Sequence, residues 1–436
     1  MYLMHRDGFI IEQIVTDINL DEAFDKVLRG KRKKSPEGQY LLAHRKEVLD
    51  NIKSEIVQGT FRVTEYWEKE IYEGGKWRKI QITKMERRIG VFAIMNVVDA
   101  YFRKRFIRTT AASIKRRGTH DLENCIRRDM AEDPEGMKYC YEFDIVHFYD
   151  NIMPKFVMYC LHRVFKDKRL LRIMDGLLHM IPQGISKGLR SSQGLSNLLL
   201  SVFLDHYLKD VCGVAHFYRY CDDGRAFSGV KIELWMTRGI VHERTEQIEL
   251  QIKGNERVFP TQTGVDFLGY VTYDEDFVKL RKRVKQNFAR KLHQVKSRRR
   301  RRELIASFFG VAKHANCNNL FYKLTGKTMR SFKDLKVAYK PEDGKKRFPG
   351  VVVSIRELVN LPIVVKDFET GIKTEQGEDR CIVAIEQNGE AKKFFTNSEE
   401  MKNILAQVKE MPDGFPFETV IKTETFGKGR TKYVFT

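Results

Sequence analysis

The sequence predicts an α+β protein in which a long region of mixed helices and strands precedes a smaller, mainly β region. Apolar residues recur at three- and four-residue spacing through residues 1–60, which is typical of amphipathic helices. From about residue 325, short β-branched and aromatic segments alternate with Gly, Asn and Asp turns. Between them lie two acidic clusters about 75 residues apart, 143–149 and 220–223, each framed by apolar and aromatic residues as in buried strands.

The composition indicates a globular protein with two or three domains, since the chain has 436 residues and 42% hydrophobic content. No stretch approaches the roughly 20 apolar residues of a membrane span, and the N-terminus lacks the apolar core of a signal peptide. The seven cysteines form no C-x-x-C pair, which argues against structural zinc and suits a reducing compartment. We therefore expect a cytoplasmic protein without a membrane partner.

The positive charge is concentrated in the first three quarters of the chain. The formal net charge is +21, and residues 325–436 contribute only +3 of it, with 20 Lys and Arg against 17 Asp and Glu. The preceding 324 residues therefore carry +18. Such an excess favours a polyanionic partner, with a generically basic protein as the alternative.

The first part of the chain predicts helices around one hairpin. Residues 61–84 alternate with period two and contain Gly74-Gly75, which indicates two strands joined by a turn. The expected elements in order are a helix from 11 to 28, a basic loop at 30–36, a helix at 41–56, the hairpin, a helix at 86–108, and a basic loop at 113–121 that opens another helix.

The middle of the chain predicts strands alternating with helices. The strand that contains Asp144 comes first. The elements expected after it are a helix at 154–181, a Gly-rich loop at 182–193, a helix at 194–210, a hairpin around Asp222 and Asp223, a helix and strand to about 259, a strand at 265–270, and basic helices at 280–324.

The C-terminal region predicts five or six strands and one helix, which suggests a small β-barrel of the OB type. The expected helix covers residues 399–408. The expected strands are 351–355, 363–368, 381–385, 393–396, 419–423 and 432–435.

Three aspartates, Asp144, Asp222 and Asp223, stand out because carboxylates in apolar surroundings are costly unless a cation meets them. Converging from two adjacent strands, they would form an oxygen site for two Mg²⁺ ions. The alternatives are a locally hydrogen-bonded carboxylate for Asp144 and an exposed turn for the pair.

The order of these motifs resembles the palm of a reverse transcriptase. Asp144 matches the first strand motif, and Tyr220-Cys221-Asp222-Asp223 matches the Tyr-x-Asp-Asp turn. The pattern Gly188-x-x-x-Ser192-Gln193 is closer to prokaryotic reverse transcriptases of diversity-generating retroelements than to intron or retroviral enzymes. One departure is Lys187, where that group usually has an aliphatic residue; this puts base-selective infidelity in doubt.

The resemblance implies an RNA-directed DNA polymerase with fingers, palm and thumb, covering about residues 1–324. It implies that Asp144, Asp222 and Asp223 bind two Mg²⁺ ions, with Mn²⁺ as a substitute, and that Tyr149 excludes the ribose 2′-OH. The expected domains are N-terminal helices and fingers at 1–135, palm at 136–278, thumb at 279–324, and the β-rich domain at 325–436.

The resemblance also implies residues that contact nucleotide and nucleic acid. For several of these side chains, including the finger cations, Lys253 and the Arg298–Arg302 run, a solvated surface position is the alternative. The incoming nucleotide would meet Lys76, Arg78, Tyr149, Gln193 and Lys253. Template and primer would meet Arg117, Lys187, Arg190, Arg298, Arg299, Arg300, Arg301, Arg302, Lys313 and His314.

The implied partners are a template non-coding RNA, a cDNA or DNA primer, dNTPs and, in the diversity-generating type, a small basic accessory protein. The same palm also serves antiphage defence reverse transcriptases that copy their own non-coding RNA, so this alternative stays open. A third alternative is a non-catalytic nucleic-acid-binding relic, against which the three intact aspartates argue.

Overall fold

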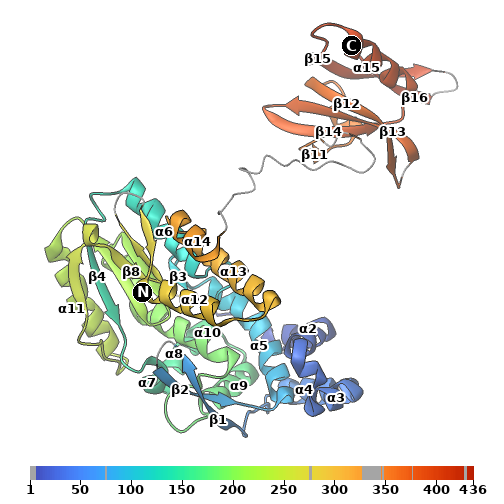
Figure 1. The fold of residues 1–436 in the computed structure, drawn as a ribbon. Coiled ribbons are helices and arrows are strands. Elements are labelled where there is room, and N and C mark those ends of the chain that lie inside the picture. Colours follow the sequence, from blue (N-terminus) through green and yellow to red (C-terminus); the bar gives the residue numbers. More distant parts are fainter. Residues whose placement is uncertain are drawn as a thin grey trace. The chain divides into compact units, whose positions relative to one another are not determined.

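The structure, a computed structural model, describes residues 6–73, 76–273, 277–326, 345, 348–375, 377–426 and 430–436. The chain divides into two compact units, Met1–Met329 and Arg330–Thr436. Figure 1 shows the helices and strands of both units. Each unit has its own apolar core, so each is described by itself.

Five short elements form the N-terminal helical part. Buried Leu20, Phe24 and Val27 anchor its second helix in the core. The elements are α1 (Ile10–Ile14), α2 (Asp17–Val27), the 3₁₀ turn η1 (Gly30–Lys34), α3 (Pro36–Ala43) and α4 (Arg45–Gln58). The predicted basic loop is thus a 3₁₀ turn, and the predicted helix 41–56 is two helices that break at His44, whose backbone is not helical.

A hairpin and two long helices follow. The antiparallel strands β1 (Trp67–Glu73) and β2 (Lys76–Ile82) confirm the predicted hairpin, and its turn residues lie outside the described part. The buried helix α5 (Met85–Arg103) leads through β3 (Thr110–Ala111) to α6 (Thr119–Glu132).

A five-stranded sheet in the order β3-β5-β6-β4-β7 forms the centre of the first unit. Helix α11 packs against β4, β6 and β7, while α6 packs against β3 and β5. After β3, the sheet and its covering helix consist of β4 (Tyr139–Asp144), β5 (His216–Tyr220), β6 (Asp223–Ser228), α11 (Lys231–Glu246) and β7 (Arg257–Pro260).

The connection from β4 to β5 is helical and differs from the prediction in two places. The predicted helix 154–181 is two helices, because Asp167 accepts hydrogen bonds from the N–H groups of Arg169 and Leu170 and starts a new helix. The predicted helix 194–210 starts at Arg190 and continues as π-helix. The elements are α7 (Phe148–Asn151), α8 (Pro154–Val164), α9 (Lys168–Leu178), α10 (Arg190–Leu200), η2 (Ser201–Asp205) and η3 (Tyr207–Val211).

A small sheet and three helices complete the first unit. The predicted strand 265–270 is a hairpin that turns at Leu268 and Gly269, both with positive φ. The elements, after the short 3₁₀ turn η4 (Thr261–Thr263), are β8 (Val265–Phe267), β9 (Tyr270–Thr272), β10 (Val278–Leu280), α12 (Lys282–Gln294), α13 (Arg298–Ala312) and α14 (Asn318–Thr325).

The second unit is β-rich, as predicted, but its described strands form an open six-stranded sheet in the order β11-β14-β13-β12-β15-β16. Because β11 and β16 are the two edges of this sheet, the described part does not close into the expected OB-type barrel. Its elements are β11 (Val351–Val352), η6 (Ile355–Leu358), β12 (Pro362–Thr374), β13 (Gly377–Gln387), β14 (Glu390–Thr396), α15 (Glu399–Glu410), β15 (Phe417–Phe426) and β16 (Arg430–Phe435).

Across the described ranges of both units, none of the helices has the length and apolar character needed to span a bilayer.

Candidate active site

The central sheet places two of the three aspartates directly beside each other. Strands β4 and β6 are antiparallel, and Asp144, the last residue of β4, pairs with Asp223, the first residue of β6. Strands β5 and β6 form the predicted hairpin, with Tyr220 opposite Asp223. Asp222 lies in the two-residue turn between them. All three carboxylates therefore gather at one end of the sheet.

Two local features shape this hairpin. Cys221 has a φ of 61°, the left-handed conformation that a tight turn requires. Gly224 leaves room for the Phe143 ring on the neighbouring strand, because a Cβ at Gly224 would lie 2.2 Å from Phe143 Cζ. The Phe143 ring therefore packs closely against Gly224, directly after the aspartate turn.

A cation contacts each of the paired aspartates. Lys253 Nζ lies 2.5 Å from Asp144 Oδ1, and the Lys253 N–H donates to the Asp144 carbonyl at 2.8 Å. Arg225 Nη1 lies 2.5 Å from Asp223 Oδ1, and the same guanidinium donates to the Asp266 carbonyl at 3.0 Å. Lys253, predicted to contact nucleotide, therefore lies in this cluster.

Ionisation of Asp222 and Asp223 is harder than that of an exposed aspartate. Burial, and then the nearby charge of Asp144, raises the pKa of Asp222. Burial raises the pKa of Asp223 to about 6, although Arg225 acts in the opposite direction. A divalent cation at this position would relieve both effects.

The donor set fits Mg²⁺ bound together with a substrate. Among the described residues, no group of three or more His, Cys, Asp or Glu side chains is arranged to hold a metal ion by itself. Mg²⁺ in nucleotide enzymes is usually held by one or two carboxylates plus substrate phosphates and water. Three acidic side chains at the end of one sheet supply that kind of open oxygen site.

Tyr149 reaches the aspartate turn because the chain bends after β4. In a regular strand Tyr149 would lie on the opposite side from Asp144. Instead β4 ends at Asp144, His147 has a φ of 42°, and Tyr149 lies in the short helix α7. The Tyr149 hydroxyl and Cys221 Sγ are 3.2 Å apart, so the ring is tied to the turn beside Asp222.

The hairpin β1–β2 contacts the Gly-rich loop through Gln81 on β2. Gln81 Oε1 accepts hydrogen bonds from the Lys187 N–H at 3.1 Å and the Ser186 hydroxyl at 3.3 Å. A Cβ at Gly188 would lie 1.6 Å from the Gln81 carbonyl oxygen, so only glycine permits this approach.

Outside the aspartate cluster, two of the residues predicted to bind nucleotide are exposed. Arg78 is exposed on β2, and Gln193 is exposed in the first turn of α10. The side chain of Lys76 lies outside the described part of the chain.

Three cations predicted to contact nucleic acid have partners within the protein. Lys187 Nζ pairs with Asp150 at 2.7 Å, and Arg190 pairs with Asp99 at 2.8 Å. Arg117 donates to the Ile107 carbonyl at 2.8 Å. These contacts fix the loops that carry the cations.

The predicted thumb residues lie on and just after α13. Residues 298–302 are all exposed and occupy the first turns of this helix. Arg299 and Arg300 both bond to Glu303. Lys313 is exposed, whereas the His314 ring stacks on His120 of α6 with centroids 4.2 Å apart.

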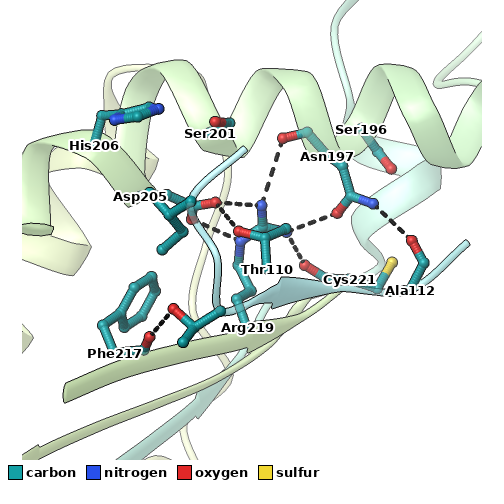
Figure 2. A network of polar contacts seen from close by, with 12 residues as sticks. Thr110, Ala112, Ser196, Asn197, Ser201, Asp205, His206, Phe217, Arg219 and Cys221 are labelled. Carbon is teal, nitrogen blue, oxygen red and sulfur yellow. Dashed lines mark hydrogen bonds and ion pairs between the residues drawn. The ribbon is translucent and has the colours of Figure 1, made fainter. Parts of the chain in front are cut away.

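The sequence interpretation missed a buried polar network behind the aspartate turn (Figure 2). Arg219 on β5 pairs with Asp205 of η2, and it also donates to Asn197 Oδ1 of α10 at 3.0 Å. Arg219 Nη1 further donates to the Cys221 carbonyl at 2.5 Å. The sequence signal that could have found this network is a single arginine, Arg219, within the otherwise aromatic strand 216–220.

Residues 69–272 match the family described as reverse transcriptase (RNA-dependent DNA polymerase), and residues 349–436 match a domain of unknown function (DUF8468). A comparison with curated proteins gives no match. Among solved structures, apo telomerase from Candida tropicalis is similar over 65% of this chain and 61% of its own, at 12% identity and a TM-score of 0.44.

A second similar structure is telomerase from Candida albicans in complex with a TWJ fragment of telomeric RNA. It is similar over 67% of this chain and 61% of its own, at 11% identity and a TM-score of 0.40. The chain therefore spans about three fifths of the length of these telomerases.

Proposed function

We propose that this chain extends a DNA primer at Asp144, Asp222 and Asp223, copying an RNA encoded by its own element, because residues 69–272 match the reverse transcriptase family. The observation that carries the proposal is the direct pairing of Asp144 with Asp223 at the end of the central sheet, with Asp222 in the adjoining turn. Reverse transcriptase domains are generally metal-dependent, and these carboxylates would hold two Mg²⁺ ions, with Mn²⁺ as a substitute.

Such ions, when bound, would lower the pKa of a primer 3′-OH and stabilise negative charge on the oxygens of the transferred phosphoryl group. The protein's own residues hold the surrounding groups in place. Arg225 fixes the Asp223 carboxylate from the protein side, and Lys253 places an ammonium group beside Asp144. That ammonium is a proton donor for the leaving pyrophosphate.

Tyr149 is proposed to select deoxyribose. The contact between its hydroxyl and Cys221 Sγ keeps the ring next to the aspartate turn, where the sugar of a bound nucleotide would lie. Lys76, Arg78 and Gln193 are proposed to contact the incoming nucleotide. Arginine suits a triphosphate because its planar guanidinium forms paired hydrogen bonds to phosphate oxygens.

The thumb helix α13 supports binding to template and primer phosphates. Its first turns carry the five exposed arginines 298–302. They lie at the N-terminus of the helix, which is the positive end of the helix dipole. Each cation there is unfavourable by roughly 0.3–1 kcal/mol, which a bound polyanion would offset. Lys313, His314, Arg117, Lys187 and Arg190 are proposed to complete the nucleic-acid contacts.

The diversity-generating type is the proposed subclass, supported by the pattern Gly188-x-x-x-Ser192-Gln193. One observation favours the second candidate, a defence enzyme that copies its own non-coding RNA. Lys187 stands where diversity-generating enzymes usually have an aliphatic residue, and its ammonium pairs with Asp150 at 2.7 Å, which argues against base-selective infidelity.

The C-terminal unit is proposed to bind a protein. The C-terminal unit, Arg330–Thr436, contains 19 Lys and Arg against 17 Asp and Glu, a net charge of only +2 in a chain of +21. A domain that tracks single-stranded nucleic acid usually has a positive groove. The small basic accessory protein of the diversity-generating type is the proposed partner.

The test is to purify the protein from its native locus, incubate it with dNTPs and Mg²⁺, and sequence the attached nucleic acid. One enriched non-coding RNA with matching cDNA is expected, with errors at template adenines in the diversity-generating case. Accurate or repetitive cDNA would instead support defence. If neither RNA nor cDNA is present while poly(rA)–oligo(dT) is extended, the dedicated-template proposal is wrong.

A further inference from the structure

The turn between α2 and α3 presents five cations within six residues. The residues are Arg29, Lys31, Arg32, Lys33 and Lys34, and all five are exposed. We call this segment, residues 29–34, the N-terminal basic turn. It lies outside the residues assigned to the polymerase site.

The N-terminal basic turn is held in a defined conformation. The Arg32 carbonyl accepts hydrogen bonds from the Ser35 hydroxyl at 2.7 Å and the Ser35 N–H at 3.1 Å. Gln39 Nε2 donates to the Lys33 carbonyl at 2.6 Å. A Cβ at Gly38 would lie 2.1 Å from the Arg32 carbonyl oxygen, so glycine lets α3 close against the turn. The cations therefore project from a fixed backbone.

The charge of this turn is not compensated by carboxylates of the protein. Within the described ranges, no ion pair includes any of its five cations. The neighbouring helices behave differently, since Lys26 pairs with Glu22, Arg45 with Asp21 and Asp25, and Lys53 with Asp17. Five adjacent unpaired cations repel one another, and a polyanion would remove this cost.

The composition of the turn favours a phosphodiester backbone over a membrane surface. None of residues 29–39 is an exposed large hydrophobic side chain, whereas a membrane-binding segment needs an apolar face as well as cations. Lysines bind phosphate as point charges, without reading base sequence. The ligand chemistry is therefore a nucleic-acid backbone, which RNA or DNA could supply.

We propose that the N-terminal basic turn binds the backbone of the template-bearing RNA at a second site, away from the polymerase centre. Figure 1 shows α2, α3 and α4 on the side of the polymerase unit opposite the palm strand β4. The partner is RNA rather than DNA because RNA is the molecule that the proposed function retains through synthesis. In this respect the inference rests on the proposed function.

The test compares two full-length variants that each lose four positive charges. The first carries Arg29→Ser, Lys31→Ser, Lys33→Ser and Lys34→Ser, and it keeps Arg32, which donates to the Val27 carbonyl. The control changes Lys26, Lys53, Lys402 and Lys432 to Ser, each of which is already paired with a carboxylate. Anisotropy measures binding to a 30-base-pair RNA duplex between 50 and 300 mM salt, and primer extension measures turnover on saturating poly(rA)–oligo(dT).

The turn variant should bind the RNA duplex about 10³- to 10⁴-fold more weakly at 100 mM salt, with a log–log salt slope smaller by about 3 to 4. Its turnover should stay within about twofold of wild type, and the control should match wild type in both assays. An unchanged slope would show that the turn contacts no phosphate. A similar loss on a DNA duplex is expected, because the turn contacts phosphates only, whereas equal competition by poly-glutamate would overturn the assignment to a phosphodiester backbone. A parallel loss of turnover would overturn a site separate from the polymerase centre.

Failure of the proposed function is distinguishable in the same preparations. Wild-type protein that extends no primer would contradict the polymerase proposal, while the binding slopes report on the turn regardless of turnover.

Discussion

Arg219 and Asp205 form an ion pair with both side chains 0% exposed and a closest N–O distance of 2.6 Å. The same guanidinium donates to the carbonyl of Cys221, the residue immediately before Asp222. Figure 2 shows Arg219 between the helix that carries Asp205 and Asn197 and the turn that carries Cys221. This buried ion pair therefore links the helix that carries Asp205 to the aspartate turn and helps to hold the turn in place.

Replacing this pair distinguishes its contribution to the stability of the fold from its role in positioning the aspartate turn. Arg219→Met alone leaves Asp205 buried and unpaired, which costs about 3–5 kcal/mol of unfolding free energy. The double variant with Asp205→Leu removes both charges and should recover most of that loss, because apolar pairs of similar volume are tolerated. It still lacks the donor to Cys221, so turnover should fall at least tenfold and half-saturating Mg²⁺ should rise.

Urea unfolding and single-turnover primer extension measure the two effects. The control is the double variant Arg87→Met and Glu55→Leu, which replaces another arginine–carboxylate pair. In wild type these two side chains lie 2.5 Å apart, at a site away from the turn. It should keep the wild-type Mg²⁺ dependence. A stable Arg219–Asp205 double variant with wild-type turnover would show that the pair has no positioning role.

Gly188→Ala tests the contact between the fingers and the Gly-rich loop. The added Cβ would lie 1.6 Å from the Gln81 carbonyl oxygen, so the loop or the hairpin must shift. We expect kcat/KM for dTTP on poly(rA)–oligo(dT) to fall at least tenfold. Gly239→Ala in α11 is the control, because a Cβ there meets nothing within 4 Å. Wild-type kcat/KM in Gly188→Ala would contradict a role for this contact.

Tyr149 variants test the sugar selection. Tyr149→Ala removes the ring beside the turn and should lower the preference for dNTP over rNTP by about 10- to 200-fold, since a pocket rejects an added hydroxyl only to that extent. Tyr149→Phe keeps the ring but loses the hydroxyl that contacts Cys221 Sγ, so its preference should fall less than that of Tyr149→Ala. Competing dTTP and rUTP incorporation gives the ratio, and an unchanged ratio in Tyr149→Ala rules out this role.

Glu123 makes stability depend on pH. Its side chain in α6 is buried, and among the described residues only one of its carboxylate oxygens has a hydrogen-bond partner, the Thr272 hydroxyl. Burial raises its pKa from 4.5 to about 7. Because the folded protein holds this proton more tightly than the unfolded chain, stability falls as pH rises from about 4.5 to 7, by about 3 kcal/mol at most.

Glu123→Gln cannot ionise and should flatten that dependence, which leaves the variant more stable than wild type above pH 7. Urea unfolding at pH 5 and pH 8 measures the difference. Equal pH dependence in the two proteins would mean that Glu123 is ionised in the fold throughout this range.

Much of the architecture follows from short-range patterns in the sequence. The alternation around Gly74-Gly75 predicted the hairpin β1–β2, and the apolar frames of Asp144 and Asp223 predicted adjacent strands. The β-rich C-terminal unit was also predicted from its segments. These features depend on local periodicity, which a single sequence displays.

The rest depends on contacts between distant residues. The break at His44 and the cap at Asp167 decide where helices end, although apolar periodicity continues across both. The open C-terminal sheet depends on which strand edges pair, and strand propensity does not encode that choice. The Arg219 network joins residues 110, 197, 205 and 221, so no local pattern reveals it.

The central claim is that the aspartates at the end of the central sheet catalyse RNA-templated DNA synthesis. Primer extension on poly(rA)–oligo(dT) with Mg²⁺, comparing wild type with the double variant Asp222→Ala and Asp223→Ala, tests it most directly. Wild type should extend the primer, the double variant should not, and both should largely retain RNA binding. Continued DNA synthesis by the double variant would contradict the assignment of the active site.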